Sequence, residues 1–213
     1  MKIFAEKEAE EFLEKRGFKI IKRIYIKKQE DLKKATKKID FPLVIKVSGK
    51  KIIHKNKIKG IKTNIKNYGQ ALKAFKKIKK IKDFEGAMIQ KQVDGKEFLL
   101  GIKKTQEFEH VIAFGAGGIY TEKLKDTSFR ICPFNKSEAG KMIKEVKAAR
   151  DLKSKSINMI EKNLIKLCQL VKKYPKIKEL DINPLIVKRR KATIVDARIV
   201  WASDVHERSS IIQ

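Results

Sequence analysis

The residues whose types and spacing could do chemistry lie closest together near the C-terminus, in a segment typical of a β-hairpin. Its two predicted strands span 179–187 and 192–200. A turn centred on residues 189–190 places Asn183 directly opposite Asp196, and Asp181 opposite Arg198. Because successive side chains of a strand point to opposite faces, these four side chains share one face of the predicted hairpin.

The other face of this hairpin is apolar and is expected to pack against the core. It carries Ile182, Pro184, Ile186, Val195, Ala197 and Ile199. Carboxylate and amide oxygens suit Mg²⁺, which binds few protein groups and keeps water and phosphate oxygens as its other ligands. The pattern alone leaves two interpretations open, a magnesium site or an ordinary solvent-facing strand with a salt bridge. For an isolated hairpin the second is favoured.

Strands and helices mix along the rest of the chain without strict alternation. The apolar spacing predicts helices over 7–16, 29–39, 137–151 and 156–174, and one that Asn67 caps and that reaches Ile81. It predicts strands over 41–47, 87–93, 97–104, 111–114, 119–124 and 127–131. This mixture indicates an α+β protein built as two lobes.

The charge balance raises a nucleic-acid-binding module as an alternative. The chain has 53 Lys and Arg against 25 Asp and Glu, a net charge of +28. Only 8 of the basic residues are arginines, and the lysines spread over every segment. Base reading and stacking favour arginine and exposed aromatic residues, so a dedicated nucleic-acid surface is the weaker interpretation.

The two cysteines, Cys132 and Cys168, follow an N-terminus that is charged and unlike a signal peptide. We therefore expect reduced, buried thiols in a cytoplasmic protein. The longest uncharged apolar run, near 111–120, is too short to span a bilayer.

The hairpin carries a family resemblance. Asp181–Leu185 followed by Val195–Arg198 resembles the C-terminal hairpin of the ATP-grasp acyl-CoA synthetases, succinyl-CoA synthetase included. In that family the Asn and the Asp hold the nucleotide's magnesium, so the resemblance assigns the metal to Asn183 and Asp196.

Three more blocks are similar to the ADP-forming acetyl-CoA synthetase branch of that family. They are Phe41–Ser48, Ile52–Lys55 with Lys59–Ile61, and Gly115–Glu122 with Lys125–Ile131. With the hairpin, the resemblance covers nearly the whole chain, and the order and spacing of the four blocks make it specific. The chain departs from the family at Lys59, where paired glycines are usual, and this restricts the backbone there.

The resemblance implies a nucleotide-binding role for Lys46 and catalytic roles for His54 and Arg130. Lys46 would contact the nucleotide phosphates as a point charge. His54 would carry a phosphoryl group on its imidazole, whereas His110 and His206 are expected to be structural or surface residues. Arg130 would stabilise charge on the transferring group, with an ion pair to Asp126 or Glu122 as the alternative.

Further residues would bind the nucleotide. Gln90, Lys91, Gln92 and Val93 would form the hinge between the lobes and read the adenine edge, and Glu97 would accept hydrogen bonds from the ribose or the adenine amine. The Gly115, Gly117 and Gly118 segment matches neither a dinucleotide fingerprint nor a Walker A loop. It is expected to be a tight turn whose backbone approaches a ligand.

By the same resemblance, the fold is an ATP-grasp fold with ATP or ADP and Mg²⁺ between two α/β lobes, 1–92 and 93–213. The reaction is acyl-CoA + ADP + phosphate ⇌ acid + CoA + ATP. A separate alpha subunit would supply the CoA site and a second histidine, in an α2β2 heterotetramer in the cytoplasm. Another ATP-grasp carboxylate ligase, without phosphohistidine, is the alternative enzyme.

Overall fold

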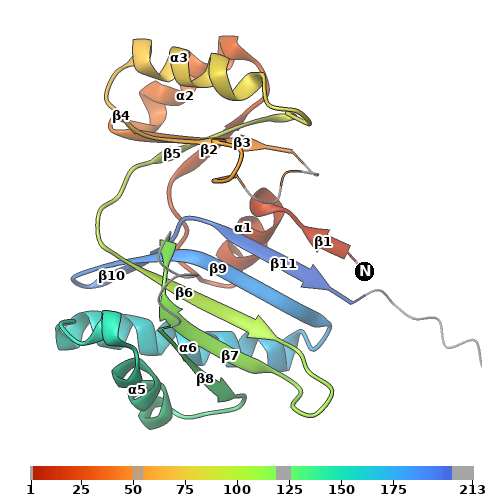
Figure 1. The fold of residues 1–213 in the computed structure, drawn as a ribbon, viewed down its shortest axis with the longest axis vertical. Helices are drawn as coiled ribbons and strands as arrows, with labels where there is room; N and C mark the ends of the chain where they lie inside the picture. The colour runs from red at the N-terminus through yellow and green to blue at the C-terminus, as the bar shows by residue number, and fades with distance from the viewer. Residues whose placement is uncertain (1, 50–51, 53–54, 119–125, 203–213) are drawn as a thin grey trace, which may run out of the picture.

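Two β-sheets with their helices form two lobes in the computed structural model, which describes residues 2–49, 52, 55–118 and 126–202. The smaller sheet has the strand order β2-β5-β3-β4, and the larger has the order β1-β11-β9-β6-β7-β8 with β10 paired to β9. Figure 1 shows the smaller sheet above the larger one. The expected α+β architecture is confirmed.

Among the described residues, the smaller lobe has four strands, two α-helices and one short 3-10 helix. They are β2 (Arg23–Ile26), η1 (Gln29–Asp31), α2 (Leu32–Ile39), β3 (Leu43–Ser48), β4 (Ile61–Ile65), α3 (Tyr68–Lys79) and β5 (Gly86–Lys91). Asn67 caps α3 as predicted, because its side chain accepts from the backbone N–H of Gln70 at 2.9 Å. The apolar sides of α2 and α3 pack against the sheet. Phe75 of α3 and Ile45 of β3 are fully buried where the helices contact the sheet.

The larger lobe contains the remaining elements. They are β1 (Lys2–Phe4), α1 (Glu6–Glu14), β6 (Lys96–Lys103), β7 (Val111–Ala116), β8 (Thr127–Ile131), α5 (Lys136–Glu145), η3 (Lys147–Ala149), α6 (Ser154–Lys173), β9 (Ile177–Lys188), β10 (Lys191–Ile194) and β11 (Ala197–Trp201). The core side of this sheet includes Leu100, Ile112 and Leu180, which are buried in one cluster with Leu164 of α6.

The first helix lies with the larger lobe, which differs from the expected first lobe of 1–92. β1 pairs with β11, and Phe4 stacks on Trp201 with ring centroids 5.7 Å apart. Phe12 of α1 contacts the same ring edge-on at 5.6 Å. These contacts hold β1 and α1 on the larger sheet, so the larger lobe is discontinuous in sequence and the chain enters the smaller lobe only at β2.

Cys132 and Cys168 form a disulfide, which corrects the expectation of two reduced thiols. Cys132 follows β8 and Cys168 lies on α6, with Cα atoms 5.6 Å apart, a usual span for a disulfide. The sequence could not show this pairing, because 36 positions separate the two residues and only the packing of α6 brings them together.

Most predicted elements are present, with shifted ends. The helix expected over 137–151 ends at Glu145 and is followed by η3. The strand expected over 119–124 and most of the tail lie outside the described residues. In the described ranges, no helix is both long and apolar enough to cross a membrane.

Candidate active site between the lobes

The C-terminal hairpin has the register that the sequence predicts. β10 pairs with β9 in this register, and β11 continues it with Asp181 opposite Arg198. Between the two ladders, the backbone N–H of Asn183 donates to the carbonyl oxygen of Asp196 at 3.2 Å. Asn183 and Asp196 are therefore neighbours across the hairpin.

A β-bulge in β9 changes which of its side chains are buried. The pairing of β9 with β6 shifts by one residue at the Asn183–Pro184 step. Beyond this step Leu185 is fully buried, whereas Ile186 is partly exposed. The expectation that Ile186 faces the core was wrong, because it assumed strict alternation through a strand that contains an extra residue.

The glycine-rich turn after β7 meets the hairpin at Asn183. The backbone N–H of Gly118 donates to Asn183 Oδ1 at 2.8 Å, and that of Gly117 donates to the carbonyl oxygen of Glu97 at 3.0 Å. Gly118 has a φ of +70°, and a Cβ there would lie 1.9 Å from Glu97 Oε2, so the position requires glycine. Four residues that the sequence singled out separately thus come together here.

Four charged side chains form a cluster between the lobes: Glu6, Lys46, Lys55 and Asp196, called the inter-lobe cluster below. Lys46 Nζ lies 2.8 Å from Glu6 Oε1 and 3.5 Å from Asp196 Oδ2. Lys55 Nζ lies 2.9 Å from Glu6 Oε2 and 3.0 Å from Asp196 Oδ2. Lys46 also donates to the carbonyl oxygen of Val195 at 2.5 Å. Both lysines belong to the smaller lobe and both carboxylates to the larger, so the cluster joins the lobes.

Burial and mutual charge set the ionisation of the inter-lobe cluster. Burial alone would raise the pKa of Glu6, but the ammonium groups of Lys46 and Lys55 outweigh it and lower that pKa. Burial would lower the pKa of Lys46, whereas Asp196 and Glu6 hold it above its ordinary value. Burial, followed by the charge of Glu6, raises the pKa of Asp196. Both lysines are therefore cationic at neutral pH, and they can bind phosphate in exchange for a carboxylate.

A further carboxyl group, Glu10, lies one helical turn after Glu6 and is fully buried. Arg23 Nε approaches Glu10 Oε2 at 2.6 Å, but neither oxygen of Glu10 has a well-aligned hydrogen bond within the described structure. Burial outweighs this contact and, with repulsion from Glu6, raises the pKa of Glu10 to about 9. The raised pKa favours the protonated, uncharged form of Glu10 beside the inter-lobe cluster.

The predicted hinge residues lie where the chain passes from β5 to β6. Gln90 is buried on β5, and its Nε2 donates at 3.3 Å to the Val195 carbonyl that also accepts from the cluster lysine. Lys91 ends β5, Gln92 follows it, and Val93 packs against the core of the larger lobe. The structure thus places this segment beside the inter-lobe cluster.

The structure does not bring Arg130 to the inter-lobe cluster. Arg130 lies on β8, at the edge of the larger sheet and three strands from β9. Its Nη2 lies 2.5 Å from Glu145 Oε1 and its Nε 3.3 Å from Glu138 Oε2, both on α5. Of the two alternative partners, Asp126 accepts instead from backbone N–H groups at η3, and Glu122 lies outside the described residues. The contacts of Arg130 join β8 to α5, and a catalytic role for it stays a prediction.

The three histidines differ in what can be said of them. His54 and His206 lie outside the described residues. His110 is buried, and its Nε2 lies 2.9 Å from the carbonyl oxygen of Ile177. This contact fits the structural role predicted for His110.

Asn183 and Asp196 fit a magnesium ion that takes most of its ligands from water and phosphate. Within the described ranges, no three His, Cys, Asp or Glu side chains gather as a metal site. Mg²⁺ requires only one or two carboxylates besides these other oxygen ligands. Asn183 and Asp196 are bonded through their backbones, and the amide and carboxylate oxygens that they carry, with the side chain of Asp196 23% exposed, are the donor types that this ion takes.

Sequence reasoning missed Glu6 and Lys55. Glu6 and Glu10 share the face of α1 that buries Ala9 and Leu13, and carboxylates on an apolar face are rarely buried without a partner. That spacing was the available signal for Glu6. Lys55 carries no such signal, because lysines are spread throughout this chain.

Comparisons with known proteins agree with this geometry. The family model described as ATP-grasp domain matches residues 1–200. The beta subunit of acetate–CoA ligase (ADP-forming) I from Pyrococcus furiosus is 35% identical, covering 92% of this chain and 90% of the relative. This chain belongs to the ATP-grasp family of ADP-forming acetate–CoA ligase beta subunits.

Several other relatives of this ATP-grasp chain are longer. Acetate–CoA ligase (ADP-forming) II from Archaeoglobus fulgidus is 36% identical over 93% of this chain, which spans only 30% of that relative. Among solved structures, acetyl-coenzyme A synthetase 1 of Candidatus Korarchaeum cryptofilum, in complex with coenzyme A and Ca-AMPCP, matches with a TM-score of 0.86 at 28% identity, covering 94% of this chain and 93% of that one. The expected ATP-grasp fold is confirmed.

Proposed function

We propose that this ATP-grasp chain is the nucleotide-handling subunit of an ADP-forming acyl-CoA synthetase, which converts acyl-CoA, ADP and phosphate into acid, CoA and ATP. The observation that carries the proposal is the contact between Lys46 of the smaller lobe and Asp196 of the larger, at 3.5 Å. ADP would lie between the lobes with its phosphates at Lys46 and Lys55. Relatives named for this reaction support the proposal.

Asn183 and Asp196 would hold the magnesium ion, which neutralises phosphate charge when bound. To do so, Asp196 must release Lys55 and Lys46, whose ammonium groups now lie 3.0 and 3.5 Å from it. The released lysines would then bind the phosphates. Nucleotide binding would therefore exchange one set of paired charges for another and leave no buried charge alone.

His54 would carry the phosphoryl group. In the ATP-forming direction, the P–N bond to its imidazole breaks as a P–O bond to the β-phosphate of ADP forms. Its chain neighbour Lys55 lies in the inter-lobe cluster, which supports this role. A structure of the Korarchaeum enzyme with coenzyme A and Mg-AMPPCP has a phosphohistidine segment pointing towards the nucleotide binding site, with a TM-score of 0.79 to this chain.

The remaining site residues would bind and orient the nucleotide. The backbone of 90–93 would read the adenine edge, and Glu97 would accept from the ribose or the adenine amine. Gly117 and Gly118 would let the backbone approach the ligand. Arg130 would stabilise the transferring phosphoryl group only if β8 and the inter-lobe cluster draw closer than they are here.

A separate alpha subunit would supply the CoA site and the second histidine, in an α2β2 complex in the cytoplasm. The chain spans only 30% of its Archaeoglobus relative, so the rest of that protein has room for such a subunit. Intracellular proteins of hyperthermophiles contain disulfides, so the Cys132–Cys168 disulfide is compatible with a cytoplasmic location.

Labelling of the protein by ATP that carries a radioactive γ-phosphate tests the proposed function. We expect acid-labile label on the chain, and its complete loss in His54→Ala. Lys73→Ala, an exposed position on α3, serves as the control and should label like the native protein. Equal labelling of His54→Ala would contradict the phosphohistidine step and favour another ATP-grasp carboxylate ligase.

A further inference from the structure

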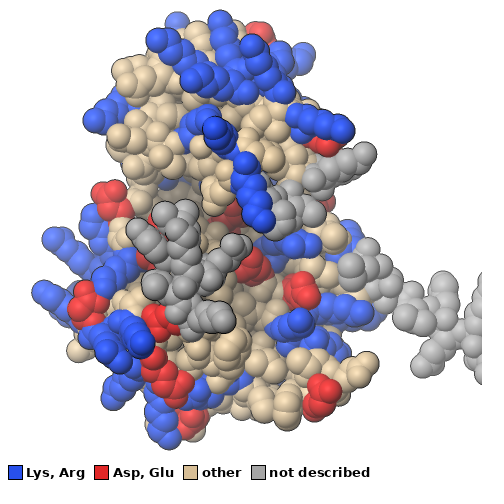
Figure 2. Space-filling view, in the orientation of Figure 1, with Lys and Arg blue, Asp and Glu red and all other residues tan. Residues whose placement is uncertain are grey.

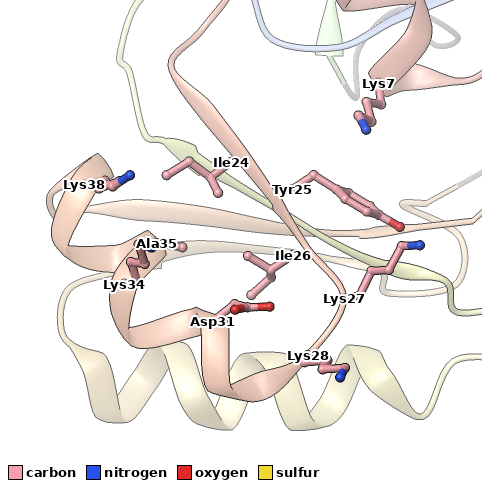
Figure 3. A pocket seen from close by; sticks show the side chains of 10 residues that line it. All are labelled: Lys7, Ile24, Tyr25, Ile26, Lys27, Lys28, Asp31, Lys34, Ala35 and Lys38. Carbon is pink, nitrogen blue, oxygen red and sulfur yellow. The ribbon is translucent and has the colours of Figure 1, made fainter.

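A groove runs along the free edge of β2, and none of the four residues of the inter-lobe cluster is among those that line it. β2 is the outermost strand of the smaller sheet, where β5 is its neighbour. A pocket of about 750 Å³ follows this edge (Figure 3). Its lining residues are Lys7, Ile24, Tyr25, Ile26, Lys27, Lys28, Asp31, Lys34, Ala35 and Lys38. Since Tyr25 points to the sheet face opposite Ile24 and Ile26, a pocket that touches all three must lie at the edge.

A second pocket extends this groove toward the start of β2. It has a volume of about 500 Å³ and shares Lys7 and Tyr25 with the first. Its lining continues through residues 20–23 and Met88, and includes the carboxylates Glu11 and Glu14 of α1. The two pockets together accompany β2 along its whole length, which is the shape that an extended peptide requires.

The backbone of β2 has donors and acceptors that face this groove. The N–H of Lys91 donates to the carbonyl oxygen of Lys22 at 3.1 Å, so residues 22 and 91 form a hydrogen-bonded pair. In an antiparallel ladder such pairs alternate, so the backbone groups of Ile24 bond to β5 and those of Arg23 and Tyr25 face outward. An outward-facing edge of this kind can accept a further strand.

The side chains around the larger pocket are mostly basic and lack ionic partners. Five lysines line it against one carboxylate, Asp31. Within the described structure none of the five forms an ion pair, and the one interaction of this group is Lys7 Nζ over the Tyr25 ring at 5.1 Å. Figure 2 shows lysine and arginine side chains gathered over the same lobe. The larger pocket therefore has an apolar floor at Ile24, Ile26 and Ala35 between cationic rims.

We propose that this groove binds an acidic, extended segment of the alpha subunit, which adds to β2 as a fifth strand of the smaller sheet. The choice of partner rests on the proposed function, whereas the acidic strand follows from the free edge and the unpaired lysines. Figure 3 shows Lys7, Lys28 and Lys38 on three sides of the groove, an arrangement for charges spaced along a peptide and not for one compact anion.

Nucleic acid fits the groove less well. The Tyr25 hydroxyl donates to the carbonyl oxygen of Glu85 at 3.0 Å and Lys7 covers its ring, so this aromatic side chain is not available to stack on a base. The larger pocket also has no arginine among its lining residues.

Charge reversal on the rim of the groove tests the proposal. We expect Lys34→Glu with Lys38→Glu to weaken binding of the purified alpha subunit about tenfold or more at low salt, measured by calorimetry. Lys73→Glu with Lys76→Glu, on the exposed side of α3, makes the same charge change elsewhere on the lobe and should have a much smaller effect. Equal losses for both pairs, or no loss for either, would overturn the proposal.

Amide exchange measured by NMR tests the added strand itself. Saturating alpha subunit should slow exchange of the Tyr25 amide about tenfold or more, and should leave the Ile24 amide, already bonded to β5, nearly unchanged. Unchanged exchange at Tyr25 in the saturated complex would overturn the proposal. A second outcome would also overturn it. In that outcome the Lys34→Glu, Lys38→Glu variant loses binding of single-stranded DNA or RNA but still binds the alpha subunit normally.

The ATP-forming activity of the native complex separates this inference from the proposed function. A complex that assembles through the groove but forms no ATP would remove the proposed function alone. A fully active complex that is indifferent to the groove pair would remove the groove alone.

Discussion

The inter-lobe cluster and the Arg130 network, which consists of Arg130, Glu138 and Glu145, both pair basic side chains with carboxylates at similar distances. The side chains of Lys46 and Glu6 are 6% and 4% exposed, whereas those of Glu138 and Glu145 are 37% and 50% exposed. Coulomb attraction is stronger where water is excluded, and an unpaired charge costs more there. Burial, and not the presence of an ion pair, therefore distinguishes a site that must exchange charged ligands from a surface contact.

Glu6→Gln breaks this comparison most severely. It leaves two buried ammonium groups with one carboxylate, so we expect the free energy of unfolding to fall by about 3–5 kcal/mol. Urea denaturation at neutral pH measures this loss. Glu145→Gln is the matched control on the exposed network and should cost at most about 1 kcal/mol. Equal costs for the two variants would show that burial does not separate the two regions.

Lys46→Met tests the same comparison through activity. Losing a preorganised charge at the phosphates should lower the rate of phosphoryl transfer about 100- to 1,000-fold. The rate of label incorporation from ATP measures this, with circular dichroism to confirm that the variant is folded. Arg130→Met should leave the rate nearly unchanged, and a comparable loss in that variant would restore Arg130 to the catalytic residues.

The disulfide joins the end of β8, the strand that carries Arg130, to α6. Cys132 lies two residues after Arg130, and its bond to Cys168 on α6 closes a loop across 36 positions. Replacing both cysteines with alanine should lower the free energy of unfolding by about 2–4 kcal/mol, chiefly because the unfolded chain gains freedom. Thermal unfolding with and without a reducing agent checks this. A double variant as stable as the oxidised protein would contradict it.

The ionisation of Glu10, beside the inter-lobe cluster, makes the free energy of unfolding depend on pH. Burial raises the pKa of Glu10 in the folded protein to about 9 from an ordinary value of 4.5, so the folded state keeps a proton that the unfolded state releases. This contribution to stability is full below pH 4.5 and is lost as pH rises toward 9, by at most about 1.4 kcal/mol per pH unit.

The difference in unfolding free energy between the native protein and Glu10→Gln, measured from pH 5 to pH 9, isolates this effect. The native protein should lose stability relative to the variant as pH rises. A difference that is constant across this range would mean that Arg23 keeps Glu10 ionised in the folded protein.

Local pattern was sufficient for the hairpin but not for the site as a whole. The pairing of Asn183 with Asp196 follows from a turn and a period of two, both of which are local, and the structure has it. Glu6 reaches Lys46 across 40 positions because β1 pairs with β11, and no local pattern encodes that pairing. For the same reason the sequence alone assigns the first helix to the smaller lobe and predicts two reduced cysteines.

Arg130→Ala has the smallest expected effect on stability, and it tests whether exposure alone distinguishes the Arg130 network from the inter-lobe cluster. Its hydrogen bonds, above all, lower the pKa of Glu145 to about 2, yet that carboxylate is half exposed to water. Water therefore screens most of the attraction, and Arg130→Ala should change the free energy of unfolding by at most about 1 kcal/mol, less still in high salt. Urea denaturation at two salt concentrations measures both quantities. A larger cost that salt does not reduce would mean that the Arg130 network behaves as a buried one, and exposure alone would then no longer distinguish the two regions.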